Sequence, residues 1–505
     1  MNYPGKKTNP TLSRRDFFRQ SSCAALGVTG IVNTLSHLLL TKSALAMLPL
    51  NDYKALVVLF LFGGNDANNM LIPSATHPSR ADYDSARGIL AIPTIGMHLL
   101  DYPTMIDRQY GLHPDLEPLA ELFNSGDLSF VANVGTMVEP IPNRDAFLND
   151  TVQLPPRLFS HSDQQLQWQS SIPDQPFTSG WGGRIADLLN PSYNVPDGKI
   201  SMSISLAGVN RLMVGSDVIQ YTVSSSGITQ FAGAGYSTSS PPYPYDKALN
   251  ADDTYKDNND GRRLKAFEDI MNYAHAHLLE NAQNLVVRRA RAAEGFVGDA
   301  LAAAAAAGVD FDSIFLNAQS KLGDRLKMIA QLIAGRDSLA NERQIFFVSI
   351  GGYDNHNAQL PAHENLMREL GRSLKAFSTA MKALTVDDKV LTISHSDFAR
   401  TLTPNKVDPT TAGSDHAWGS HQIVMGGPVD GGKIFGFFPS LVIGGDQDAG
   451  TKGRGRWIPT TSVEQYQAVA ADWLGVQSEQ LAMIFPNLSR FEDPFNPAAN
   501  LGFIT

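Results

Sequence analysis

Cysteine and positive charge are both scarce in this chain. Its 505 residues include one cysteine, Cys23, which lies near the N-terminus, so no intramolecular disulfide can form and stability must come from an apolar core. Lys and Arg number 40 against 50 Asp and Glu, a formal net charge of −10. This acidic balance argues against nucleic-acid binding. With 43% hydrophobic residues, the chain is long enough to build a large core in one domain or two.

Residues 1–46 have the parts of an export signal rather than of a folded element. The segment SRRDFF (13–18) contains a twin-arginine pair, a weakly apolar stretch (23–40) follows, and ALA (44–46) matches an A-x-A cleavage site. Polar residues interrupt the apolar stretch, so it makes a poor transmembrane helix. We expect a signal peptide read by the twin-arginine translocase, a periplasmic protein, and no transmembrane segment in the mature chain.

Unbroken apolar runs indicate buried parallel strands. Residues 54–62 (KALVVLFLF) and 128–134 (LSFVANV) flank a helix-like segment at 116–123, which favours βαβ units. The same pattern resumes later, with strands at 345–350 and 390–393 and helices at 361–384 and 462–474. We therefore expect residues 47–505 to form an α/β domain with a doubly wound, mostly parallel sheet.

The middle of the chain departs from this pattern. Residues 199–231 look like short strands and turns, and residues 235–245 form a loop rich in Ser, Pro and Tyr. Residues 262–307 have helical composition and end in an alanine run. We expect residues 195–310 to form an insertion or cap of short strands and helices on the α/β domain.

Histidine and aspartate are interleaved in the C-terminal part of the chain. Asp66, Asp354 and Asp397 each follow an apolar run, so a parallel sheet would place them at its carboxyl edge, where ligands bind. Imidazoles and carboxylates together bind Zn²⁺, Mn²⁺ or similar cations. The predicted ligands of a divalent metal are Asp66, Asp354, His356, Asp397, His416 and His421; Zn²⁺, Mn²⁺ and Ca²⁺ stay open, as one ion or two. We expect His363 and His395 not to be ligands.

Three further residues are predicted to act on a substrate. Ser160 is a candidate nucleophile because a metal or a neighbouring base can activate a hydroxyl, and it also fits a helix N-cap. Arg184 and Arg400 can clamp a phosphate or sulfate through two parallel hydrogen bonds, or can be ordinary salt-bridge residues.

Several segments in combination resemble an exported bacterial family known as DUF1501, a domain of unknown function. They are GGNDANNMLIP (63–73), GLHPDLEPL (111–119), SHSDQQ (160–165), GWGGRIAD (180–187), GGYDNH (351–356), SHSDFARTL (394–402) and DHAWGSH (415–421). That family is placed by similarity in the alkaline phosphatase and sulfatase superfamily. The resemblance covers almost all of the chain after residue 46, and it implies a doubly wound sheet with a metal site at its carboxyl edge.

The resemblance also implies roles for individual residues. Asp66 resembles the superfamily's first-strand metal aspartate. Asp354 and His356 resemble its Asp-then-His metal pair, at a shorter spacing, and Asp397 resembles the aspartate of the later Asp-His pair. Either His416 or His421 resembles the last histidine.

Two positions bear on activity within the resemblance. Ser160 falls where the nucleophile at a helix start would lie, whereas Phe398 stands where the superfamily has a histidine ligand. The resemblance implies a metal-dependent hydrolase of small phosphate or sulfate esters. The alternative is a non-catalytic exported scaffold or partner protein with a degenerate metal site. A polymer-binding module resting on Trp168, Trp181 and Trp418 is a third interpretation, which core packing of these side chains explains equally well.

Overall fold

The computed structural model describes residues 52–101, 109–194, 200–227, 247–250, 252, 254–272, 295–450 and 452–505. The predicted leader, residues 1–46, lies outside these ranges. Residues 53–505 belong to one compact unit. In the described part of the chain, no helix has the length and apolar character needed to cross a membrane.

Strand β1 (Lys54–Phe62) lies inside the main sheet and contributes to two hydrophobic cores. Its even-numbered side chains from Leu56 to Phe60 pack into one cluster, and its odd-numbered side chains from Val57 to Leu61 pack into another. All of them are buried, and each such side chain contributes about 1.5–3 kcal/mol when removed from water. The unbroken apolar run is therefore explained by burial on both faces of the sheet.

The main sheet has nine strands, eight of them in the order β11-β5-β10-β9-β1-β8-β6-β7, with β12 pairing β5. Besides β1, its strands are β5 (Leu128–Gly135), β6 (Ser203–Ser205), β7 (Tyr221–Thr222), β8 (Arg343–Gly351), β9 (Val390–Ser396), β10 (Ser420–Met425), β11 (Ile434–Gly436) and β12 (Thr461–Ser462). Strand β1 is parallel to both of its neighbours, β8 and β9. Strand β10 is antiparallel to β9 and β5.

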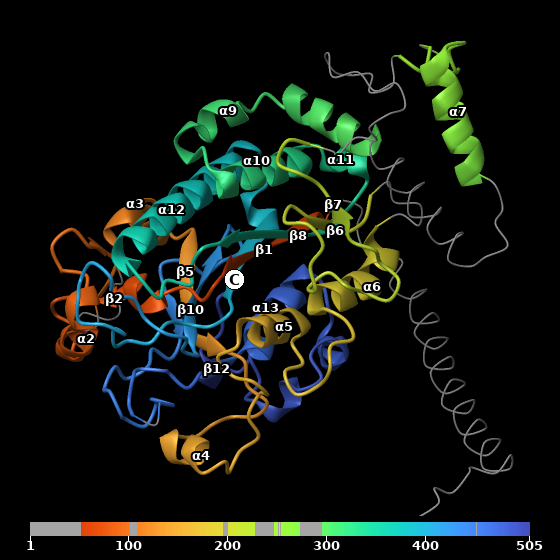
Figure 1. The fold of residues 1–505 in the computed structure, drawn as a ribbon. Helices are drawn as coiled ribbons and strands as arrows, with labels where there is room; N and C mark the ends of the chain where they lie inside the picture. The colour runs from red at the N-terminus through yellow and green to blue at the C-terminus, as the bar shows by residue number, and fades with distance from the viewer. Residues whose placement is uncertain are drawn as a thin grey trace, which may run out of the picture. The chain divides into compact units, whose positions relative to one another are not determined.

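Helices cover both faces of this sheet (Figure 1). One core receives side chains of α3 (Glu117–Asn124), α10 (Lys321–Ala334) and α12 (Gln359–Ala383). The opposite core receives side chains of α5 (His161–Ser170), α6 (Trp181–Tyr193) and α13 (Val463–Leu474). The predicted α/β class with a doubly wound, mostly parallel sheet is confirmed.

Most of the remaining elements are short. A second sheet of three antiparallel strands contains β2 (Leu71–Pro73), β4 (Tyr110–Leu112) and β3 (His98–Leu99). Further α-helices are α2 (Arg80–Arg87), α4 (Arg144–Leu148), α7 (Asn259–Asn272), α9 (Phe311–Ile314), α11 (Arg336–Leu339) and α14 (Leu481–Ile484). Trp168, Trp181 and Trp418 are at most 1% exposed, so these tryptophans offer no surface for a polymer.

Local sequence signals set several element boundaries as expected. Ser462 caps α13, because its Oγ accepts a hydrogen bond from the backbone N–H of Gln465. The Oε1 atom of Gln465 in turn accepts one from the backbone N–H of Ser462, which completes a capping box. The predicted helix at 361–384 is α12. The predicted insertion at 195–310 does not stand apart from the sheet throughout, because β6 pairs in parallel with β8 and β7 pairs with β6.

Candidate functional site

The carboxyl edge of the sheet brings together residues that are far apart in the sequence. Asp354 follows β8 and Asp397 directly follows β9, and these parallel strands end at the same edge. Because β10 runs antiparallel, the segment before it also lies at this edge, and a backbone bridge joins His416 of that segment to Arg400. This is the edge at which open α/β sheets bind ligands.

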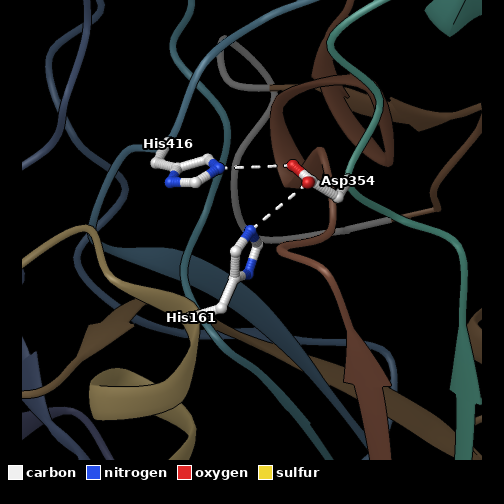
Figure 2. A group of neighbouring side chains, drawn as sticks. All are labelled: His161, Asp354 and His416. Carbon is white, nitrogen blue, oxygen red and sulfur yellow. Dashed lines mark hydrogen bonds and ion pairs between the residues drawn. The ribbon is translucent and has the colours of Figure 1, made fainter.

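Three side chains converge here from three separate parts of the chain (Figure 2). His161 is the first residue of α5, Asp354 follows β8, and His416 precedes β10. One potential ligand atom from each residue lies within 4.8 Å of the other two. The Nε2 atom of His161 is 3.4 Å from Asp354 Oδ2, and the Nε2 atom of His416 is 3.3 Å from Asp354 Oδ1.

His356 brings a third imidazole to the same carboxylate. Its Nε2 atom lies 2.9 Å from Asp354 Oδ1 and 3.0 Å from His416 Nε2. We refer to His161, Asp354, His356 and His416 as the histidine–aspartate cluster. The sequence predicted Asp354, His356 and His416 as ligands, and the structure brings these three together.

Each imidazole of the histidine–aspartate cluster uses its Nδ1 atom to reach an oxygen outside the cluster. The partners are Asp397 Oδ2 for His161 at 2.7 Å, Phe159 O for His416 at 2.7 Å, and Asp415 Oδ1 for His356 at 3.1 Å. A carbonyl oxygen or an ionised carboxylate can only accept, so these partners assign the proton of each ring to Nδ1. In the neutral rings the three Nε2 atoms then carry lone pairs; because the Asp354 carboxylate can also only accept, a second proton on His356 or His161 would be directed at it.

The cluster therefore directs lone pairs toward one another. The Nε2 atoms of His356 and His416 face each other at 3.0 Å and cannot both be bare acceptors at that distance without repulsion. The Nε2 atom of His161 is buried and has no hydrogen-bond partner in the described part of the chain, although Asp354 is close. A proton on one ring or a cation between the donors relieves this arrangement.

Arg400 places a positive charge beside the Asp354 carboxylate of the cluster. Its side chain is fully buried, and Nη1 donates to Asp354 Oδ1 at 2.6 Å while Nη2 donates to Ser414 O. Burial alone would raise the pKa of Asp354, but the hydrogen bond and the charge of Arg400 outweigh it and hold that pKa below its usual value. Arg400, predicted as a substrate clamp, is thus bound to the Asp354 carboxylate.

The surroundings of the cluster shift the pKa values of two of its histidines in opposite directions. The hydrogen bond that His161 donates to the Asp397 carboxylate raises the pKa of His161 above its usual value. Burial lowers the pKa of His416, which disfavours a second proton on that ring. His161 and His416 also pack against the ring of Phe398, with ring centroids 4.7 Å and 4.6 Å away. Phe398 forms an apolar wall at the position where the resemblance implied a histidine.

Asp397 lies behind the cluster rather than within it. Its Oδ2 atom accepts from His161 Nδ1 and, at 2.7 Å, from Gln165 Nε2. Its Oδ1 atom accepts from the backbone N–H of Gly63 at 3.2 Å. The fully buried carboxylate orients His161, as the outer partners of metal-binding histidines do.

Asp66 forms a buried ion pair instead of joining the cluster. Its Oδ2 atom contacts the guanidinium of Arg87 and accepts from Gln359 Nε2. Both charged side chains are at most 2% exposed, and Arg87 also donates to the carbonyl oxygens of Thr401 and Leu402. The structure therefore gives Asp66 a structural partner where the sequence predicted a metal.

His421 and Arg184 also lie apart from the cluster. His421 is 3% exposed, accepts from the backbone N–H of Asn133 at 3.2 Å and stacks on Phe438; burial lowers its pKa to about 3. Arg184 donates to the backbone carbonyl oxygens of Ser179, Ser170 and Ile484. These contacts place His421 in the core and use Arg184 to tie segments together.

Ser160 lies next to the cluster along the chain. It is the N-cap of α5, and its Oγ donates to Asp163 Oδ2 at 2.6 Å rather than capping the helix backbone. His161, which follows it, is the cluster residue that sequence reasoning did not assign as a ligand. The available signal was the segment SHSDQQ, whose histidine lies between the two serines that suggested a nucleophile.

The comparisons with known proteins identify the family. The model described as "Protein of unknown function (DUF1501)" matches residues 53–446, so this chain belongs to the DUF1501 family. No curated protein matches the chain. Among solved structures, the chain is similar to the PsFucS1 sulfatase from Pseudoalteromonas sp., with 10% sequence identity and a TM-score of 0.30. That match covers 77% of this chain and 66% of the sulfatase chain, just under two thirds of its length.

Proposed function

We propose that this protein is an exported, metal-dependent hydrolase of phosphate or sulfate esters. The observation that carries the proposal is the meeting of three imidazole Nε2 atoms around the Asp354 carboxylate, with His356 and His416 at 3.0 Å. Three imidazole nitrogens and a carboxylate held this close together are the donor types that bind a divalent transition metal. The resemblance of the sequence motifs to the phosphatase and sulfatase superfamily supports the choice of substrate class.

The donor set fits a transition metal. His161, His356 and His416 offer nitrogen, and Asp354 offers oxygen, which suits Zn²⁺ or Mn²⁺ better than Ca²⁺ with its preference for oxygen ligands alone. The unpartnered, buried Nε2 atom of His161 supports this fit. When bound, such a cation supplies charge neutralisation of the ester oxygens and of the leaving group.

The chain's own residues orient and shield this centre. Asp397 and Asp415 hold the rings of His161 and His356 through Nδ1, which keeps their Nε2 atoms directed at Asp354. The buried ring of Phe398 excludes water from one side. Side chains that are already oriented can stabilise charge on an anionic ester without reorganising during the reaction.

Ser160 is the proposed nucleophile. Its Oγ would attack phosphorus or sulfur and form a seryl ester as the bond to the leaving oxygen breaks; Asp163, which already accepts the hydroxyl hydrogen bond at 2.6 Å, receives the serine proton, and the departing alkoxide takes a proton from water. Water then cleaves the seryl ester and releases phosphate or sulfate. The position of Ser160 at the start of α5, beside His161, supports this role.

A turnover assay with a matched pair of serine variants tests the proposal. Metal-loaded protein is assayed with p-nitrophenyl phosphate and p-nitrophenyl sulfate. Ser160→Ala is expected to lower kcat by about 10³-fold or more, because the nucleophile is lost. Ser489→Ala removes an exposed hydroxyl outside the hydrogen-bond network of Ser160 and Asp163 and should keep wild-type kcat. Equal activity in both variants would exclude Ser160, and no turnover of either ester by the wild type would overturn the hydrolase.

The periplasmic location rests on the twin-arginine motif in residues 1–46. Replacing both Arg14 and Arg15 by Lys should retain the precursor in the cytoplasm, as cell fractionation and the size of the product would show. Correct export of the Lys-Lys variant would contradict this part of the proposal.

A second candidate function is a non-catalytic exported partner protein. The ion pair between Arg400 and Asp354 favours it, since the guanidinium already neutralises the carboxylate that a metal would need. In that case the chain would contain no metal after purification, and chelation would leave its thermal unfolding midpoint unchanged.

A further inference from the structure

A short arginine-containing loop lies directly beside the histidine–aspartate cluster. Residues 453–456 read Gly-Arg-Gly-Arg, and the buried carboxylate of Asp448 fixes their backbone by accepting the N–H groups of Gly455 at 3.0 Å and Arg456 at 3.1 Å. The same carboxylate accepts the N–H groups of Gly444 and Gly450, each at 3.0 Å. We call residues 453–456 the arginine loop; four backbone bonds to one carboxylate make its anchor rigid.

Gly455 sets the position of the loop against the site. It has φ +70°, and a Cβ atom there would overlap Leu402, so no other residue fits without strain. The backbone N–H groups of Leu402 and Thr403 donate to the carbonyl oxygens of Gly455 and Arg454. The loop is thereby held beside the segment that follows Arg400.

The two arginines of the loop contact consecutive residues of the site. Arg454 pairs with the Asp415 carboxylate, the same group that orients His356. Arg456 donates through Nε to His416 O at 2.9 Å, and its guanidinium lies 4.4 Å from the centre of the Phe159 ring. In the described part of the chain, neither terminal nitrogen of Arg456 donates to a protein group, so one edge of its guanidinium keeps its hydrogen-bonding capacity.

We propose that Arg456, with Arg454 beside it, binds a second oxyanion group of the substrate, separate from the ester that reacts. The geometry supports this because Arg454 pairs with the Asp415 carboxylate, whereas the Arg456 guanidinium bonds a backbone carbonyl oxygen and has no carboxylate partner among the described residues, although the formal net charge of the chain is −10. An edge-on guanidinium binds phosphate, sulfate or carboxylate through two parallel hydrogen bonds. The substrate class is then an ester that carries an additional acidic group.

The assignment of the group to a substrate rests on the proposed hydrolase function, but the anion subsite itself does not. It can therefore be measured without turnover and without metal. Inorganic phosphate is titrated calorimetrically into the full chain in the presence of a chelator. Arg456→Gln should weaken binding about tenfold, which corresponds to about 1.4 kcal/mol. Arg368→Gln, a half-buried arginine of α12 that pairs with Asp115 and Glu364, is the matched control and should bind as the wild type does.

Equal phosphate affinity in wild type and Arg456→Gln, or the same loss in Arg368→Gln, would overturn the subsite, as would a wild-type chain that binds no phosphate. Arg456→Met keeps an apolar stem against Phe159 and replaces the Gln variant if the latter lacks a cooperative unfolding transition.

A second arm tests whether the bound group belongs to the substrate. In metal-loaded Ser160→Ala protein, 4-carboxyphenyl phosphate should bind about tenfold more tightly than phenyl phosphate, and Arg456→Gln should abolish that difference. If both ligands bind equally to the Ser160→Ala protein that retains Arg456, the assignment of the anion subsite to a second group of the substrate is overturned. If neither ligand binds, the hydrolase function fails, while the titration with inorganic phosphate still decides on the subsite.

Discussion

The Nε2 atoms of His356 and His416 face each other at 3.0 Å, and neither ring can turn its proton inward without losing an Nδ1 hydrogen bond. The carbonyl of Phe159 and the carboxylate of Asp415 hold these rings from outside. This relationship supports the proposed binding of a cation at the cluster. The proposal ties stability of the folded state to occupancy of the cluster, because a cation that binds only the folded chain stabilises it.

Metal should therefore raise the thermal stability of the protein. At a Zn²⁺ concentration about 100 times the dissociation constant, the expected stabilisation is about 2.7 kcal/mol. Differential scanning calorimetry of chelated and Zn²⁺-loaded protein measures it. His356→Ala should reduce the increment, whereas His98→Ala, which removes a partly exposed histidine of β3, should not. An increment that survives in His356→Ala would place the stabilising ion elsewhere.

Asp397→Asn should weaken metal binding while leaving the ligands in place. The carboxylate accepts from His161 Nδ1 and carries the charge that makes this ring a better donor. Removing that charge is expected to cost about 10–100-fold in Zn²⁺ affinity, measured by competition with a chromophoric chelator. Asp115→Asn is the control, because Asp115 pairs with Arg368 of α12, outside this contact network. Unchanged affinity in Asp397→Asn would contradict the orienting role.

Asp66→Asn should separate stability from metal content. Asp66 and Arg87 form a buried ion pair, and removing one partner leaves an uncompensated buried guanidinium, at a cost of about 3–5 kcal/mol. Urea unfolding should show this loss, whereas elemental analysis of the folded variant should show the metal content of the wild type. Asp354→Asn should lose metal as well as stability, because its carboxylate is both a proposed ligand and the partner of the buried Arg400. Loss of metal from Asp66→Asn with unchanged stability would restore Asp66 as a ligand.

Glu464, in α13, makes stability depend on pH through a group outside the histidine–aspartate cluster. Burial raises the pKa of this fully buried carboxyl from 4.5 to about 8. Between these values the folded chain holds a proton that the unfolded chain has lost, so the free energy of unfolding falls as pH rises, by about 1.4 kcal/mol per pH unit at most.

Glu464→Gln removes this titration. The variant should gain stability relative to the wild type as pH rises from about 5 to about 8, the window between the two pKa values, as urea unfolding at several pH values would reveal. A difference in unfolding free energy that does not change with pH would show that Glu464 is ionised in the folded protein.

The elements that the sequence predicted well are those that local chemistry determines. The run KALVVLFLF forms β1 over the predicted residues. A strand that is buried on both faces needs apolar side chains at every position, and this unbroken run supplies them. Ser462 capped α13 because its partner, Gln465, is only three residues away. The extension of the sheet depended instead on the pairing of β6 with the distant β8, to which β7 is added through β6, and composition does not encode that pairing.

The partners of the site residues could not be predicted from local sequence. Asp66 and Asp354 both follow apolar strands, yet Asp66 meets Arg87 of α2, a partner that no spacing reveals. The segment Ser-His-Ser-Asp occurs twice, at 160–163 and 394–397, with opposite outcomes. At the start of α5 its histidine joins the cluster, whereas in β9 the histidine is buried between Trp168 and Trp181 and its aspartate reaches the site. Identical local sequences thus differ through tertiary packing alone.

The metal content of the purified full chain tests the central claim most directly. Elemental analysis by inductively coupled plasma mass spectrometry, after dialysis, should find about one transition-metal ion per chain in the wild type and in His98→Ala, and almost none in His416→Ala. A wild-type protein that carries no transition metal and takes up none when Zn²⁺ or Mn²⁺ is added would contradict it, as would a His416→Ala variant that retains the full amount.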